Sequence, residues 1–293
     1  MVKRYKGKKK SLSLFDLFNA TFMILLMFVF FYPFWHTIVL SFSTTEYATS
    51  LGVKLFPPDI TLDSYKAVLS DSSIWVGYAN TIFRTVVGTI LKVLVCYCAG
   101  CALARKNLPF HGSITFFVVF TMLFSGGLIP TFLSIKSYGL VGSRWALILP
   151  GLASAWHILI ARNYVAGIPG ELEEAAMVDG CHPLRFVFQI LFPLSKPVLA
   201  VLALWGAVGH WNAWFDAMIY TPGDDKIVLQ LVLRRLLVDQ QSDGTLLDEV
   251  AMQVTPDTIK CATIIVAILP IICVYPFIQK HFTKGVMMGA IKG

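Results

Sequence analysis

Arg84, Lys92 and Asp216 are charged side chains that lie inside long apolar segments of this sequence. If those segments cross a membrane, each charge costs a few kcal/mol or more unless a partner or water surrounds it. Arg84 and Asp216 are both expected toward the outer half of the membrane. They are therefore candidates for lining a solute path, and a structural ion pair or an interfacial position is an equal alternative.

A second group of candidates lies close together in one later apolar segment. His210, Trp211, Asn212 and Trp214 combine aromatic faces with hydrogen-bonding groups. Sugars bind to such combinations, because apolar ring faces stack on aromatic side chains while hydroxyls seek amides and imidazoles. Tryptophan is also common at membrane interfaces without any ligand. His157 is expected to be a packed, hydrogen-bonded residue rather than a proton relay.

A third pattern lies in the loop 167–196 between two apolar segments. Pro169 and Gly170 end the first segment, and the three glutamates that follow suit the positive end of a new helix dipole. Alanines then favour continuation of the helix, and Gly180 is expected to end it. Three glutamates without a lysine favour a basic protein groove over anionic lipid as the contact of this helix.

The composition of the whole chain defines the elements that must position these groups. Of 293 residues, 56% are hydrophobic and 14% are charged, against roughly a quarter charged in an average soluble domain. The mean hydropathy of +0.70 agrees. Soluble and disordered classes are therefore excluded. The net charge is +7, but the basic residues form no stripe with interleaved aromatics, which argues against a nucleic-acid partner.

The sequence predicts an all-α membrane protein with six transmembrane helices, since a bilayer core needs about 20 apolar residues per helix. The first run is too long for the apolar core of a signal peptide, so it is expected to stay as a membrane span. The predicted spans are 17–40, 75–104, 113–133, 145–166, 197–220 and 259–279.

Charge asymmetry predicts that both termini are cytoplasmic. Segments predicted inside carry 14 of the 24 basic residues and segments predicted outside carry 8, which follows the positive-inside rule. The chain then divides into a basic tail (1–16), a transmembrane domain (17–280) and a C-terminal tail (281–293). Its outer loops are 42–74 and 221–258, and within the second of them 227–237 is expected to form an outer-surface helix before an acidic stretch.

Metal and nucleotide chemistry find no support in the residue pattern. Cys96, Cys98 and Cys101 share one apolar segment without a histidine or acid, so they are interpreted as packing residues, with no metal site and no disulfide. No Gly-x-x-x-x-Gly-Lys-Ser/Thr phosphate loop occurs, so any ATP chemistry must belong to a partner. No catalytic residue is predicted.

At the acidic loop the sequence resembles a known family. The residues that carry the resemblance are Glu174-Ala175-Ala176, Asp179-Gly180, Ile190, Pro193 and Lys196-Pro197. Their order is similar to the EAA loop of bacterial ATP-binding-cassette (ABC) importer permeases. Further likeness, to the maltose-permease-like carbohydrate branch, lies in Ile129-Pro130, Tyr138-Gly139-Leu140, 145–150, Trp211-Asn212, Lys284-Gly285 and Lys292-Gly293. Cys181-His182 departs from the small residues usual in that family.

The resemblance implies partners and a mechanism. It implies a bacterial cytoplasmic (inner) membrane permease that pairs with a second homologous permease, two ATPase subunits that bind ATP and Mg, and an extracytoplasmic solute-binding protein. The loop would dock on an ATPase, with Glu174 meeting an arginine. The coupling residues carried over are Glu173, Glu174, Ala175, Ala176, Asp179 and Gly180.

The function hypothesis is import of an oligosaccharide by alternating access. The branch includes permeases for alginate or aldouronate, and Arg84 and Lys92 would suit a uronate-bearing solute, but neutral oligosaccharides stay open. An ion-coupled secondary transporter is the alternative, although it would need intramembrane carboxylates and Asp216 is the only one. A membrane-embedded transferase would need paired acids that the sequence lacks.

Overall fold

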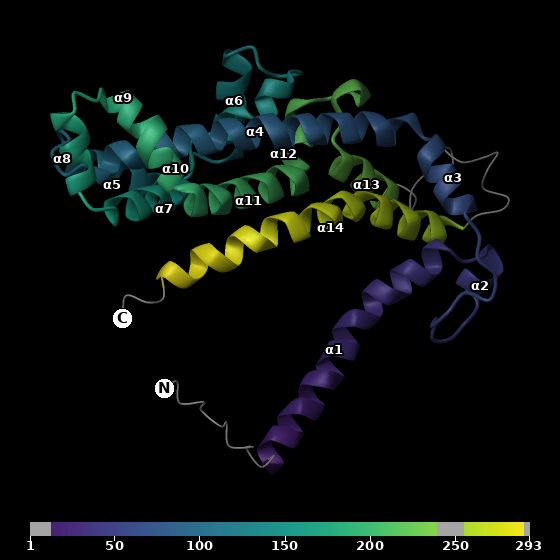
Figure 1. The fold of residues 1–293 in the computed structure, drawn as a ribbon. Helices are drawn as coiled ribbons and strands as arrows, with labels where there is room; N and C mark the ends of the chain where they lie inside the picture. The colour runs from purple at the N-terminus through teal and green to yellow at the C-terminus, as the bar shows by residue number, and fades with distance from the viewer. Residues whose placement is uncertain (1–12, 239–254, 290–293) are drawn as a thin grey trace. The chain divides into compact units, whose positions relative to one another are not determined.

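A computed structural model describes residues 13–238 and 255–289 of the chain (Figure 1). Every regular element in these residues is a helix, as the sequence predicts. The chain forms two compact units, one of Met1–Val68 with Thr245–Ile265 and the other of Leu69–Gly244 with Val266–Gly293. The acidic stretch after residue 238 and most of the basic tail lie outside the described residues.

The first unit begins with α1 (Leu14–Ser41), which contains the predicted first span. Two short helices follow, α2 (Thr45–Thr49) and α3 (Asp63–Ser70). The end of α1 is tied to α3 by a hydrogen bond of 2.8 Å between Ser41 Oγ and the Tyr65 hydroxyl. The long helix α14 (Pro256–Gly289) starts in this unit and continues beyond the predicted sixth span at 259–279.

The second unit is built around α4 (Ser72–Ala104), which contains the predicted second span. Three helices pack on it: α7 (Ala155–Ala166), α11 (Lys196–Asn212) and α13 (Leu229–Val238). Close approach requires glycine at Gly100, where an added Cβ would lie 2.5 Å from the Cβ of Ala161 on α7. Small residues of this kind let membrane helices approach each other without a large hydrophobic driving force.

A helix forms in the predicted segment 227–237, namely α13, and it lies near the start of α4. Leu229, Leu231 and Val232 are buried, and Thr81 Oγ1 of α4 accepts a hydrogen bond of 2.9 Å from the Leu229 amide. Asn80 donates to the carbonyl of Ile227 at 2.9 Å. These polar contacts fix the apolar segment on α4 although it is too short to span a membrane.

Three predicted continuous spans are broken in the structure. The span 113–133 is two helices, α5 (His111–Leu123) and α6 (Leu128–Ser137), which meet at 115°. Gly127 has a φ of +87° at this bend, a conformation open to glycine. The span 145–166 consists of the 3₁₀ turns η1 (Arg144–Leu147) and η2 (Leu149–Gly151), bent by 48° from α7. Pro150 limits helical hydrogen bonding there.

The predicted fifth span, 197–220, is broken as well. It consists of α11 and a separate short helix, α12 (Phe215–Tyr220), and the chain leaves helical geometry at Ala213. Before α11, the helices that end at Leu194 meet it at 83°, next to Pro197, which lacks an amide donor. By length and composition the described residues hold three helices able to cross a membrane, or up to six if each bent pair is one span.

Candidate functional site

Arg84 and Asp216, whose relation the sequence left open, form an ion pair in the structure. Arg84 Nη1 donates to Asp216 Oδ1 at 3.1 Å, and Nη2 donates to Oδ2. Arg84 is only 4% exposed, whereas the Asp216 side chain is 29% exposed. The two hydrogen bonds to the carboxylate neutralise the positive charge of the buried guanidinium. A charged side chain within a membrane segment needs such a partner.

The break between α11 and α12 exposes a backbone carbonyl that binds the same arginine. Ala213 adopts an extended conformation, so its carbonyl turns away from the helix and accepts a hydrogen bond of 3.2 Å from Arg84 Nη1. Non-helical backbone at membrane depth is tolerated where it is buried in protein or lines a cavity. The arginine therefore stabilises both the carboxylate and the freed carbonyl.

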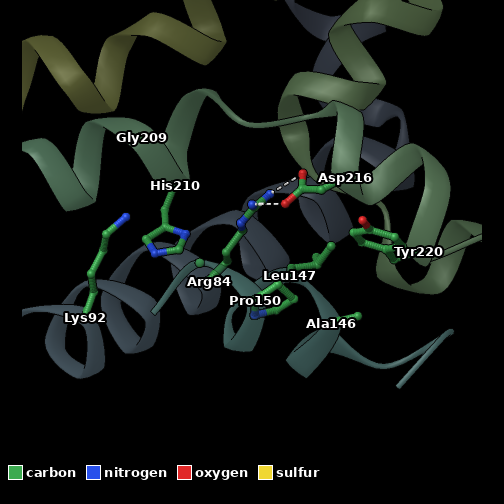
Figure 2. A pocket seen from close by; sticks show the side chains of 10 residues that line it. Arg84, Lys92, Ala146, Leu147, Pro150, Gly209, His210, Asp216 and Tyr220 are labelled. Atoms are coloured by element: carbon green, nitrogen blue, oxygen red, sulfur yellow. Dashed lines mark hydrogen bonds and ion pairs between the residues drawn. The ribbon is translucent and has the colours of Figure 1, made fainter. Parts of the chain in front are cut away.

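A pocket of about 380 Å³, lined by both charged and apolar residues, lies beside this ion pair. Figure 2 shows side chains reaching it from α4, from the turns η1 and η2, and from α11 and α12. In that view Lys92 and His210 lie at one end, the Arg84–Asp216 pair in the middle and Tyr220 beyond it. The lining residues are Arg84, Lys92, Ala146, Leu147, Pro150, Gly151, Gly209, His210, Asp216 and Tyr220.

His210 reaches the pocket because α4 carries glycine opposite it. A Cβ at Gly88 would lie 2.7 Å from Nε2 of His210, so only glycine leaves room for the ring. The imidazole is 7% exposed, and its Nε2 is the ring atom closest to Gly88, so this nitrogen faces the α4 backbone. The ring therefore forms part of the pocket wall.

Four of the seven predicted pathway residues line the pocket, and the other three lie elsewhere. Trp211 is buried with its ring against Tyr78, at 6.5 Å between ring centroids. Trp214 lies under the guanidinium of Arg234, 4.4 Å from its ring centroid, and Asn212 is exposed. Successive helix residues point about 100° apart, so the neighbours of a pocket residue face other directions.

Sequence reasoning missed the pocket wall formed by η1 and η2, together with Tyr220. A proline followed by glycine at Pro150-Gly151, inside a predicted span, was the available signal. Such a pair disfavours continuous helix, and broken helices in membranes commonly border cavities. The tyrosine gave no comparable signal, because aromatic residues are also common at membrane interfaces.

The acidic loop contains the helix that the sequence predicts there, α8 (Glu171–Val178). It ends at Val178, and Gly180, two residues further on, has a φ of +74°. The Gly180 amide donates to the Met177 carbonyl at 3.0 Å and the Cys181 amide to the Ala176 carbonyl at 2.9 Å, the two bonds of a Schellman motif. The departure at Cys181-His182 is accommodated, because His182 Nδ1 accepts from the Leu184 amide at 3.3 Å.

The residues of α8 have different surroundings. Ala176 is buried, 7% exposed, in an apolar cluster with Tyr97, Val165 and Phe186. Glu173 forms an ion pair of 2.6 Å with Arg105, which follows α4. Glu174, Ala175 and Asp179 are exposed, and Val178 is 88% exposed. The helix is thus fixed to the bundle on one side, with an acidic and apolar surface on the other.

The fold and the pocket together define a class of protein. Three of the described helices are long and apolar enough to cross a membrane, other apolar segments are broken, and a pocket with charged side chains lies among the breaks. Charged and polar groups arranged in this way within membrane segments are typical of membrane transport proteins.

Comparisons with known proteins define the family. The chain is 39% identical over 282 residues, covering 96% of itself and 99% of the other protein, to the polygalacturonan/rhamnogalacturonan transport system permease protein YtcP of Bacillus subtilis. It is 39% identical over 280 residues to protein LplC of the same organism, covering 95% of each. No family model matches the chain.

A solved structure supports the same family as the sequence relatives. A chain of a bacterial ABC transporter involved in the import of the acidic polysaccharide alginate is 32% identical, with a TM-score of 0.88, and the match covers 92% of this chain and 96% of that one. This chain belongs to the permease subunits of ABC transporters, and it is a protein of the cytoplasmic membrane. The family assignment excludes the ion-coupled secondary transporter that the sequence left as an alternative.

Proposed function

We propose that this chain carries an oligosaccharide through the pocket beside the Arg84–Asp216 pair by alternating access, driven by ATP hydrolysis in partner subunits. The observation that carries the proposal is the pocket itself, in which Arg84, Lys92, His210 and Asp216 meet between broken helices. Hydroxyl-rich solutes suit a site with several donors and acceptors. The relatives support a carbohydrate, because the name of YtcP specifies polygalacturonan and rhamnogalacturonan and the solved relative imports alginate.

The coupling element in this proposal is α8, which resembles the EAA loop. Its role is to dock on an ATPase subunit, with Glu174 meeting an arginine there. The surroundings of α8 support this role, since Ala176 and the Glu173–Arg105 pair hold it to the bundle while Glu174 is free to meet a partner. Closure of two ATPase subunits would then move α8 together with the end of α4.

The proposed partners are a second permease, two ATPase subunits with ATP and Mg, and an extracytoplasmic solute-binding protein. In this arrangement both termini and α8 face the cytoplasm, and α13 faces outside. Figure 1 supports the separation, because α8 lies where α4 ends and α13 lies near the start of α4.

The test of orientation is labelling of single cysteines, placed in a chain whose native cysteines have been replaced. A membrane-impermeant maleimide added outside intact cells is expected to label Leu237→Cys on α13 and to spare Val178→Cys on α8. Labelling of Val178→Cys from outside, or of both residues only after lysis, contradicts the orientation.

The test of function is uptake by proteoliposomes that contain this chain, the second permease and the ATPase subunits, with the solute-binding protein outside. We expect uptake of a galacturonate oligosaccharide or of a neutral oligosaccharide that requires hydrolysable ATP. A non-hydrolysable ATP analogue is the control and should give no uptake. Uptake that needs an ion gradient and proceeds without ATP contradicts the proposal.

A further inference from the structure

The two cations that line the pocket have different electrostatic surroundings. Arg84 is paired with Asp216 at two points and also donates to the Ala213 carbonyl. Lys92 lies two turns further along α4 and forms no ion pair or hydrogen bond with any residue in the described ranges. The charge of Arg84 is therefore compensated within the protein, while the charge of Lys92 is not.

Lys92 lies at a position where a charge without an ionic partner indicates a functional role. It lies well inside α4, a helix of 33 residues whose composition fits a membrane span, and it is only partly exposed. Its side chain passes α11, where a Cβ at Gly206 would lie 3.8 Å from Lys92 Cδ. An ammonium group at such depth costs free energy unless it contacts water or an anion, so an ionisable residue at this position is a candidate for a functional role.

His210 lies beside Lys92 at the same end of the pocket (Figure 2). Its ring is more than nine-tenths buried, and Nε2 is directed at Gly88 of α4. The imidazole therefore forms part of the pocket wall, and Lys92 is the group at this end whose charge a solute can meet. An ammonium can hold a carboxylate through a charge-assisted hydrogen bond.

We infer that Lys92 binds the carboxylate of a uronate unit of the solute and thereby makes the pocket selective for acidic oligosaccharides. This inference rests on the proposed function, because it assigns a substrate class to the same pocket. Arg84 does not take this role, since a carboxylate approaching it would have to displace Asp216 or share its charge.

The test is equilibrium binding of trigalacturonate to the assembled complex in nanodiscs without the solute-binding protein. The same trisaccharide with its carboxyls methyl-esterified is the neutral probe. We expect Lys92→Met to weaken binding of the acid at least tenfold and to leave binding of the ester within about twofold of wild type. Lys92→Arg keeps the charge and should retain most of the affinity for the acid.

The matched control is Lys136→Met, which removes an exposed lysine on α6 that does not line the pocket. It should bind both probes as wild type does. Equal binding of acid and ester by wild type overturns the inference, as does an equal loss of both probes in Lys92→Met, which would mark a structural role. Absence of binding of either probe also overturns it, whereas failure of the proposed function itself would appear as ATP-independent uptake.

Discussion

The pocket and the helix α8 both concentrate charge, but they differ in how much of that charge the chain itself compensates. In the pocket, a 4% exposed arginine is paired at two points, and one lysine is left without an ionic partner among the described residues. On α8, Glu173 is paired with Arg105, while Glu174 is exposed. In each region one charged group holds the structure together and another is free for a partner molecule. Removal of a paired group should therefore disturb the local structure and what depends on it, whereas removal of a free group should disturb only the binding of its partner.

The largest effect is expected from Arg84→Ala. It leaves the Asp216 carboxylate and the Ala213 carbonyl without their donor, and breaking a buried pair costs about 3–5 kcal/mol. Partial exposure of Asp216 places the loss near the lower end. The measurement is thermal unfolding of the purified complex together with uptake. The double substitution Arg84→Ala, Asp216→Ala should cost less than the two single substitutions added together. Additive losses would show that the two residues do not act as a pair.

Glu174→Lys is expected to have the next largest effect, and it acts on assembly. If Glu174 meets an arginine in a cleft of the ATPase, the change replaces attraction with repulsion and costs about 2–5 kcal/mol at the interface. A pull-down of the ATPase subunit should then recover little protein. Glu46→Lys, an exposed glutamate of α2, makes the same charge change and should leave assembly intact. Recovery of the ATPase at wild-type levels with Glu174→Lys would show that α8 is not the docking element.

Gly180→Val should have a smaller effect, confined to the end of α8. A β-branched residue is strained at a φ of +74° by about 1–2 kcal/mol. The expected result is roughly tenfold weaker binding of the ATPase subunit, because the docking helix is misdirected while the bundle still inserts. Gly180→Asn is the matched variant, since asparagine tolerates the left-handed region. Equal behaviour of the two variants would remove conformation as the cause.

The smallest effect is expected from Arg105→Ala. Its pair with Glu173 is partly exposed on both sides, 38% and 30%, so the contribution to stability is about 0–1 kcal/mol. Binding of the ATPase subunit should weaken by less than about fivefold. A loss as large as that of Glu174→Lys would mean that the paired and the free glutamate cannot be separated in function.

The sequence predicts the helices better than their breaks, for a physical reason. The apolar run that becomes α4 is long and uniform, so hydropathy alone locates it within a few residues. Hydropathy averages over a window, and it does not register Ala213 leaving the helix, because that conformation depends on Arg84 from another helix. The glycine pair Gly126-Gly127 did indicate a bend, but the high average hydropathy of the surrounding window favoured a continuous span.

For the site, the residue types in the sequence identified the charged candidates, but the sequence did not show which of them form ion pairs. The cost of charge within a membrane identified Arg84, Lys92 and Asp216. Which of the two cations is paired depends on the approach of α12 to α4, and that is a property of packing. The same holds for Glu173 and Glu174, which are adjacent in sequence but have different surroundings because only one of them faces Arg105.

The most direct measurement compares both regions in one experiment. Complexes that carry either Arg84→Ala with Asp216→Ala or Glu174→Lys are purified through a tag on this chain and assayed for bound ATPase subunit and for ATP-driven uptake. The account predicts that the pocket variant retains the ATPase subunit and loses uptake, whereas the α8 variant loses both. Wild-type assembly and uptake in the α8 variant, or loss of the ATPase subunit from the pocket variant alone, would contradict it.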